Sequence, residues 1–438
     1  MKKLIDFIRS KILKKVASLQ IVAVLTRIFA GLLTSKAIAV FIGAEGLALI
    51  GNLRNFVIAS QTVASLGFYK GIVKYVAEVK ESTLELSKVI SSVFYAGFIS
   101  TVLVCFFCYF KAEWINDLIF PTYNDYAYVI RIFAIALPFY ILNMFSFSIM
   151  NGFSKYKILI VINIIGQILG VSIALILIYQ NKIDGALIAA VITEALIFLI
   201  TLVGIINRRS LMPLIKASTC SFGFLKKMSF YSLMAFFTAV LLPLVTLSIR
   251  SYIIEHIGYK YAGFWEAMTR ISKYYLMFIS ALIALYLLPR FSEIKDNAIF
   301  KREVFTFYKI IIPILSVGLL LIYLLRKYIV LLVFSEEFQP VEDLFLWQLL
   351  GDFIKVLSIV IAYQFLAKKM FWHYVLTETF LVITLYTTSI YFIDLFDGIQ
   401  GAVIAHFVSY IMYFGIILLT FGGTLFGVEV SDKTNLKI

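Results

Sequence analysis

The sequence predicts an all-α polytopic membrane protein of about 12 transmembrane helices in two six-helix bundles, related by a pseudo-two-fold axis along the membrane normal. Three observations support this fold: the composition, recurring apolar stretches, and an internal repeat. Of the 438 residues, 62% are hydrophobic and only 15% are charged, whereas soluble domains carry about 25% charged residues. A soluble globular fold is therefore excluded.

The apolar stretches are long enough to cross a bilayer, because a helix needs about 20 residues to span roughly 30 Å of hydrocarbon. They are too long and too uniformly apolar for the strands of a barrel. The predicted spans are 19–42, 47–69, 89–110, 128–150, 158–179 and 185–206 in the first half, and 230–254, 262–288, 307–325, 344–366, 371–393 and 401–422 in the second.

These spans predict five segments along the chain. They are a basic, amphipathic cytoplasmic segment (1–18), an N-lobe (19–206), a cytoplasmic linker (207–227), a C-lobe (228–424) and a cytoplasmic tail (425–438). The first segment precedes an apolar run and superficially resembles a secretory signal. That run contains Arg27 and Lys36 and is followed by further spans, so we expect an uncleaved first helix whose basic flank lies along anionic lipid headgroups.

Lysine and arginine are distributed unevenly between the two sides of the predicted membrane. Of the 39 such residues, 25 fall on the side of the N-terminus and five on the opposite side. Positively charged loops are retained in the cytoplasm. The sequence therefore predicts that both termini are cytoplasmic and that the number of spans is even.

An offset of 216 residues brings similar segments of the two halves into register. Two parallel six-helix bundles around a central cleft form the architecture of an alternating-access transporter. Three matches share this offset: 23–25 with 239–241, 185–189 with 401–405, and Arg54 with Arg270.

Charged residues also occur within or at the edges of the predicted spans. A central cation facing lipid costs roughly 2.5 to 3.5 kcal/mol, so four of them cost on the order of 10 kcal/mol. Those near span ends, such as Lys36, Lys70 and Arg250, have the alternative of snorkelling to the interface. The cations are Arg27, Lys36, Arg54, Lys70, Arg131, Arg250, Arg270, Lys273 and Lys355, and the acids are Glu194, Glu266, Asp352 and Glu378.

Because the cations outnumber the acids, internal pairing cannot neutralise them all. A wet, electropositive cavity is the simplest arrangement, and its natural ligand is a multiply charged anion such as a diphosphate. The candidate ligand-binding residues are Arg27, Arg54, Arg270, Lys273, Arg250 and Lys355. The candidates for coupling or charge pairing are Glu266, Asp352, Glu194 and Glu378.

Helical spacing suggests which of these charges interact. Glu266, Arg270 and Lys273 are four and three residues apart, so they form one stripe on which Glu266 can orient Arg270. Asp352 and Lys355 can pair in the same way. A structural ion pair is one interpretation of Asp352; the other is that it changes partner or protonation and couples an ion gradient to transport.

Other chemistry has little support. Cys105 and Cys108 form a C-x-x-C without a second ligand pair, which favours simple packing. His406 is either a hydrogen-bonded structural histidine or part of a proton relay. We expect no metal, no cofactor and no enzymatic activity, and without a G-x-x-x-x-G-K-[ST] loop we expect no ATP hydrolysis. The net charge of +14 is spread between spans, so it does not predict nucleic-acid binding.

Five segments carry a family resemblance: 51–56, 71–77, 263–276, 286–292 and 343–355. They resemble the Wzx-type flippases of lipid-linked O-antigen and enterobacterial common antigen oligosaccharides, within the multidrug/oligosaccharidyl-lipid/polysaccharide exporter (MOP) superfamily. The resemblance implies a bacterial inner-membrane transporter in lipopolysaccharide biosynthesis. It would move undecaprenyl-pyrophosphate-linked oligosaccharide from the cytoplasmic to the periplasmic leaflet, and its partners could include a polysaccharide polymerase and a chain-length regulator.

Three other functions remain open. A multidrug or cation antiporter on the same fold would favour an acidic cleft over a surplus of lysine and arginine. A membrane glycan polymerase or ligase would present catalytic groups at the outer face, typically on a sizeable loop, whereas the predicted outer loops are short. A scaffold would not need central charges.

Overall fold

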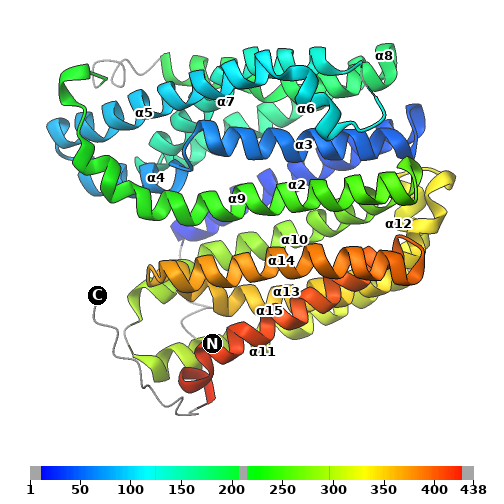
Figure 1. Cartoon of the computed structure of the whole chain (residues 1–438). Helices are drawn as coiled ribbons and strands as arrows, with labels where there is room; N and C mark the ends of the chain where they lie inside the picture. The colour runs from blue at the N-terminus through cyan, green and yellow to red at the C-terminus, as the bar shows by residue number, and fades with distance from the viewer. Residues whose placement is uncertain (1–10, 124, 207–214, 295, 427–438) are drawn as a thin grey trace. The chain divides into compact units, whose positions relative to one another are not determined.

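The computed structural model describes residues 11–123, 125–206, 215–294 and 296–426. These residues form helices joined by short connections, and no strand occurs among them (Figure 1). The prediction of an all-α fold is confirmed. The predicted basic segment, linker and tail fall partly or wholly outside the described residues.

The first half of the chain supplies five long helices. Two short helices, α4 and α6, lie in connections for which the sequence predicted no helix. The bounds are α2 Lys11–Phe41, α3 Ala44–Ala64, α4 Tyr69–Val79, α5 Thr83–Phe110, α6 Ala112–Ile119, α7 Ala127–Gly152 and α8 Tyr156–Ile206.

Helix α8 contains two of the predicted spans. Lys182 has non-helical backbone angles, with φ 47° and ψ −117°, and therefore breaks the 51-residue element into two helices. Gly185 follows this break, where a Cβ atom would lie 1.9 Å from the carbonyl oxygen of Leu177. Only glycine permits this approach of the two helices.

The second half repeats the alternation of long helices with short connecting elements. One short helix, α12, and a 3₁₀ element, η3, again occupy a connection. The bounds are η2 Ala217–Thr219, α9 Phe222–His256, α10 Tyr259–Glu293, α11 Asn297–Leu324, α12 Arg326–Val333, η3 Glu336–Leu344, α13 Phe345–Ala367, α14 Phe371–Phe396 and α15 Gln400–Phe426.

By length and composition, nine helices in the described part of the chain can cross a membrane, or ten if α3 and α4, bent by 41°, count as one span. The 12 predicted spans all fall on helices. The difference arises because α8 holds two spans, and because α3 and α10 are not among the nine. The charged residues Glu266, Arg270 and Lys273 lie on α10. The protein is therefore a multi-pass membrane protein.

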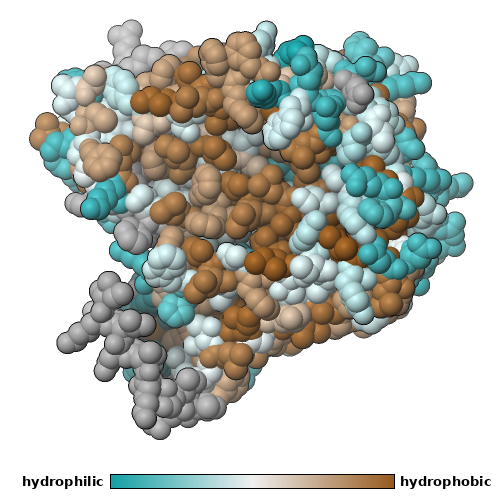
Figure 2. All heavy atoms as spheres, viewed as in Figure 1, coloured by the Kyte–Doolittle hydropathy of each residue, from teal (hydrophilic) through white to brown (hydrophobic). Residues whose placement is uncertain are grey.

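The surface agrees with this conclusion. Large apolar side chains are exposed on many helices, including Leu103 and Phe106 on α5 and Leu419 on α15. Figure 2 shows hydrophobic residues along the flanks of the helices and hydrophilic residues gathered near helix ends. Exposed apolar flanks of this extent are expected where lipid is the solvent.

The described helices fall into two compact units. The N-terminal unit comprises the described residues up to Ala267 together with Val330–Gln339, and the C-terminal unit comprises Met268–Ile329 and the described residues from Pro340 onward. In the N-terminal unit, α2 and α7 pack on α8, and α9 packs on α3 and α4. Figure 1 shows α9 running beside α3. In the C-terminal unit, α15 packs on α13 and α14.

Candidate functional site

A buried ion pair joins α9 and α10 within the N-terminal unit. Arg250 Nη2 lies 2.5 Å from Glu266 Oε2, and their side chains are 0% and 3% exposed. Arg250 Nη1 also donates to Asn52 Oδ1 of α3 at 2.9 Å. The ring of Trp265 lies 5.4 Å from Arg250 Cζ. Burial without these partners would be very costly for a guanidinium, so this cluster holds three helices in one arrangement.

Gly51 makes the close approach of this ion pair to α3 possible. A Cβ atom at this position would lie 2.8 Å from Glu266 Cδ and 2.9 Å from Arg250 Cζ. Asn52 is held in turn, because its Nδ2 donates to the carbonyl oxygen of Ile119 at 2.8 Å. Arg250 therefore differs from the sequence expectation of a ligand-binding cation: in this structure its charge is buried and compensated.

A second group of charges remains accessible in the N-terminal unit. Arg27 on α2, Arg54 on α3 and Glu194 on α8 are all exposed. The charges of Arg27 and Glu194 interact. The hydroxyl group of Tyr140 experiences the fields of both Glu194 and Arg54, and it donates to the carbonyl oxygen of Val191 at 2.9 Å. Arg27 and Arg54, from distant parts of the sequence, thus lie within electrostatic range of Glu194 or of the tyrosine beside it.

A third polar cluster centres on Asp352 in the C-terminal unit. This carboxylate on α13 is fully buried. It accepts hydrogen bonds from Ser272 Oγ at 2.5 Å, from the Tyr275 hydroxyl, and from Gln348 Nε2 at 3.3 Å. His406 Nε2 of α15 lies 3.0 Å from the other carboxylate oxygen. Four donor groups therefore converge on one acid.

Lys355 lies one helical turn beyond Asp352 but is not its hydrogen-bond partner. Its charge is attracted to those of Asp352 and Glu378, as the spacing indicates, and its Nζ lies 5.2 Å from the centre of the Tyr410 ring. Glu378 on α14 accepts a hydrogen bond from the Tyr413 hydroxyl at 2.8 Å. The direct partner of Asp352 is His406, which corrects the expected Asp352–Lys355 contact.

The other predicted ligand-binding residues lie on α10. Arg270 is buried, with 3% of its side chain exposed, and Lys273 is exposed. Both belong to the C-terminal unit. The expected stripe on α10 therefore combines a buried Glu266, a buried Arg270 and an accessible Lys273.

Several of the remaining intramembrane cations have structural partners. Lys36 on α2 donates to the carbonyl oxygen of Leu331 at 2.9 Å and to that of Phe334, at the end of α12. Arg131 pairs with Glu113 of α6 at 2.5 Å. These two cations stabilise connections on one side of the bundle. Arg27 on α2 and Arg54 on α3 are exposed.

The polar partners Asn52, Tyr275 and Gln348 escaped the sequence analysis, since a search for charges passes over neutral donors. Cys105 and Cys108 are both free thiols within α5. In the described ranges, no group of three or more histidine, cysteine, aspartate or glutamate residues could hold a metal ion.

The fold is shared with solved structures of a lipid flippase and a multidrug transporter. The structure resembles the lipid II flippase MurJ in an inward closed conformation, with a TM-score of 0.70, 16% identity, and coverage of 93% of this chain and 87% of that one. It also resembles the MATE multidrug transporter DinF-BH, with a TM-score of 0.73, 15% identity, and coverage of 95% and 97%. A multi-pass membrane protein of this fold is the class that the helices and the intramembrane charges define.

Sequence similarity identifies the family within this class. Residues 41–343 match the family described as "Polysaccharide biosynthesis protein", and the chain belongs to that family. The chain is 30% identical over 396 residues to the lipid III flippase of Escherichia coli strain K12, covering 90% of this chain and 94% of that relative. The lipid III flippase of Shigella flexneri gives the same values. The resemblance read from the sequence is confirmed at the level of the family.

Proposed function

We propose that the protein is a flippase that moves an undecaprenyl-pyrophosphate-linked oligosaccharide from the cytoplasmic to the periplasmic leaflet. The observation that carries this proposal is that Arg27, Arg54 and Glu194 are exposed on membrane-spanning helices. An accessible arginine within a span needs water or an anion. The similarity to lipid III flippases over most of the chain favours a lipid-linked saccharide as the source of that anion.

The chemistry of the two arginines suits a diphosphate. Each guanidinium offers a planar fork of donors that can hold two phosphate oxygens, and it stays charged at any physiological pH. Glu194 then limits the excess positive charge, so that the headgroup can bind and can still be released. Arg270, Lys273 and Lys355 are proposed to contribute further positive charge from the C-lobe.

Transport would follow from alternating access of the N-lobe (19–206) and the C-lobe (228–424), with most of the polyprenyl chain staying in lipid. We place the protein in the bacterial inner membrane with both termini in the cytoplasm, because lysine and arginine concentrate on the side of the termini. A polysaccharide polymerase and a chain-length regulator are the proposed partners at the periplasmic face.

Deletion of the gene tests the function directly. A flippase deletion accumulates a lipid-linked oligosaccharide that periplasmic glycan-processing enzymes cannot reach, and a plasmid-borne copy restores access. A polymerase deletion would instead place unpolymerised units on the periplasmic face. The fold similarity to multidrug transporters makes dye efflux the necessary second assay: loss of efflux with normal saccharide export would overturn the flippase proposal.

A further inference from the structure

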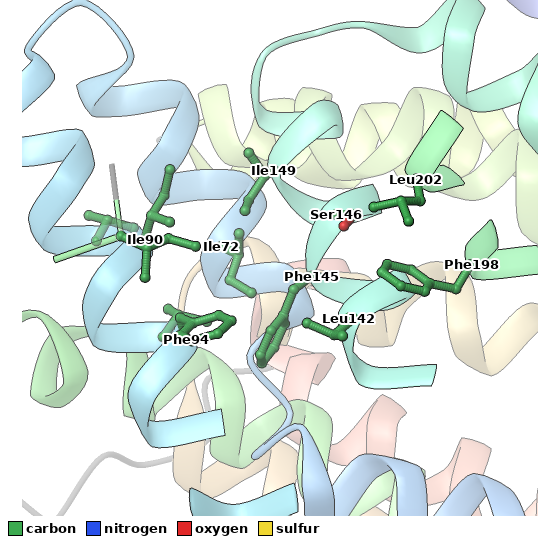
Figure 3. Close-up of a pocket in the computed structure, with 12 residues that line it drawn as sticks. Ile72, Ile90, Phe94, Leu142, Phe145, Ser146, Ile149, Phe198 and Leu202 are labelled. Atoms are coloured by element: carbon green, nitrogen blue, oxygen red, sulfur yellow. The ribbon is translucent and has the colours of Figure 1, made fainter. Parts of the chain in front are cut away.

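An apolar cavity of about 340 Å³ lies inside the N-terminal unit, among α4, α5, α7 and α8. Ser146 supplies the one polar side chain in its lining. Figure 3 shows Ile90 and Phe94 of α5 and Leu142 and Phe145 of α7 around this space. Cavities without polar partners stay dry and accept apolar molecules, so the cavity suits a hydrocarbon.

Aromatic residues connect the lining of the cavity to the outer surface of the helices. Phe94 stacks on Phe98 with ring centres 6.4 Å apart, and Phe98 is 58% exposed. Phe198 contacts Phe139 at 6.1 Å, and Phe139 is 43% exposed. These exposed rings belong to membrane-spanning helices, so a chain dissolved in lipid meets them before it meets the cavity.

A residue shortly before α9 contributes to the wall of the cavity. Ile215 lines it, and the next residue is fixed because the Lys216 amide donates to Ser91 Oγ at 2.9 Å. Thr219 Oγ1 lies 2.9 Å from the same Ser91 oxygen. Lys216 is exposed. Lys88, beside the lining residue Val89, is paired with Glu85 at 2.7 Å. The apolar wall thus lies beside one exposed lysine, Lys216, an arrangement complementary to an apolar chain that carries a phosphate.

We propose that this cavity holds part of the polyprenyl chain of the lipid-linked substrate, a role that rests on the proposed function. A dry cavity of about 150 Å³ accepts benzene, so 340 Å³ has room for a short stretch of isoprenoid chain. Lys216 beside it favours a phosphorylated polyprenol over a neutral lipid. Since Ile215 forms part of the wall, an occupied cavity would also hold Ile215 and Lys216 against α5.

Photo-crosslinking of the purified full-length chain tests the proposal. The probe is polyprenyl monophosphate without sugar, carrying a diazirine in its isoprenoid chain, in nanodiscs of phosphatidylethanolamine and phosphatidylglycerol. We expect labelled peptides to contain Phe94 and Phe145. Unlabelled polyprenyl monophosphate should suppress this labelling, and an equal excess of phosphatidylglycerol should not.

Ser146→Phe fills the cavity and should reduce labelling about tenfold, which corresponds to roughly 1.4 kcal/mol of binding. Ser172→Phe makes the same change at an exposed position of α8 outside the cavity and is the matched control. If Ser146→Phe does not fold, competition in the wild-type protein decides alone. Labelling outside the cavity, or suppression by phosphatidylglycerol, would overturn the proposal.

Saccharide export in the deletion strain separates this inference from the proposed function. If export requires the protein but the probe labels residues outside the cavity, the cavity assignment is wrong and the flippase proposal stands. If the probe labels the cavity and unlabelled polyprenyl monophosphate suppresses the labelling, but export does not require the protein, the polyprenyl site stands and the flippase proposal is wrong.

Discussion

Arg250 and Glu266 form an ion pair across α9 and α10 in which neither side chain is more than 3% exposed. The two residues are 16 positions apart and lie on different helices, yet both lie close to Gly51 of α3, and Arg250 also donates to Asn52. A pair buried this completely is sensitive to the loss of one partner and tolerant of the loss of both.

Removal of one charge from this pair should be strongly destabilising. Glu266→Gln leaves a buried guanidinium uncompensated, at a cost of about 3 to 5 kcal/mol. We expect a clearly lower melting temperature in detergent, measured by fluorescence-detected size exclusion. The double variant Arg250→Met, Glu266→Leu should recover most of the loss. A single variant as stable as the wild type would show that the pair does not stabilise this packing.

Gly51→Ala should disturb the Arg250–Glu266 pair by a steric clash. The new methyl group would lie within 3.0 Å of both side chains, and overpacking of this kind costs roughly 1 to 3 kcal/mol. Gly318→Ala is the matched control, because a Cβ atom there meets nothing within 4 Å. Thermal unfolding of the two variants in one detergent compares them. Equal melting temperatures would contradict the close packing around Gly51.

The hydrogen bonds to Asp352 predict that a second substitution at Lys355 will not restore the function lost in Asp352→Asn. Asp352→Asn turns an amide toward four donor groups, so it should impair both stability and transport. If Lys355 were the main partner, adding Lys355→Gln would restore function, since two neutral amides would replace two charges. The hydrogen bonds from His406, Ser272 and Tyr275 remain mismatched in the double variant. We therefore expect no recovery of saccharide export, and full recovery would return Lys355 to the role of partner.

Arg27 and Arg54 should be required for transport but not for insertion. Changing either residue to Gln removes a guanidinium group that can bind two phosphate oxygens. We expect the rate of export to fall at least about tenfold, equivalent to a loss of roughly 1.4 kcal/mol of binding free energy. Arg54→Lys should be partly active, because it retains the charge without the planar geometry. Immunoblots of membranes control for expression. Normal export by the Arg27→Gln, Arg54→Gln double variant would exclude these residues from the site.

The topology can be tested with single cysteines in a background that lacks Cys105, Cys108 and Cys220. Lys301 lies on the side predicted to be cytoplasmic and Lys260 on the opposite side, and both are exposed. An impermeant thiol reagent should label position 260 in intact cells and position 301 only after lysis. The reverse pattern would invert the proposed orientation.

The helices could be predicted from sequence because membrane thickness dictates their length. All 12 predicted spans fall on helices, and even the break in α8 lies between two of them, at Lys182. Short helices such as α6 and α12 were missed, since they are shorter than any span and their amphipathic faces depend on what they cover.

The charges were found by sequence, but their partners on other helices were not. Spacing along one helix connects residues three or four positions apart, which is how Glu266 was assigned to orient Arg270. The partner found for Glu266 in the structure, Arg250, lies on another helix. Asp352 likewise finds His406 on α15, 54 positions away. Such contacts depend on how the helices pack against one another, and the periodicity of a single sequence does not reveal that packing.

The lysine of the first helix has a further consequence for biogenesis. Lys36 donates to carbonyl groups 295 and 298 residues later in the chain. At about 5 to 20 residues per second, the ribosome needs roughly 15 to 60 s to synthesise that length. During this interval the nascent first helix must hold its ammonium group at the interface or in the translocon. The connection between α12 and η3 therefore completes a helix that entered the membrane many seconds earlier.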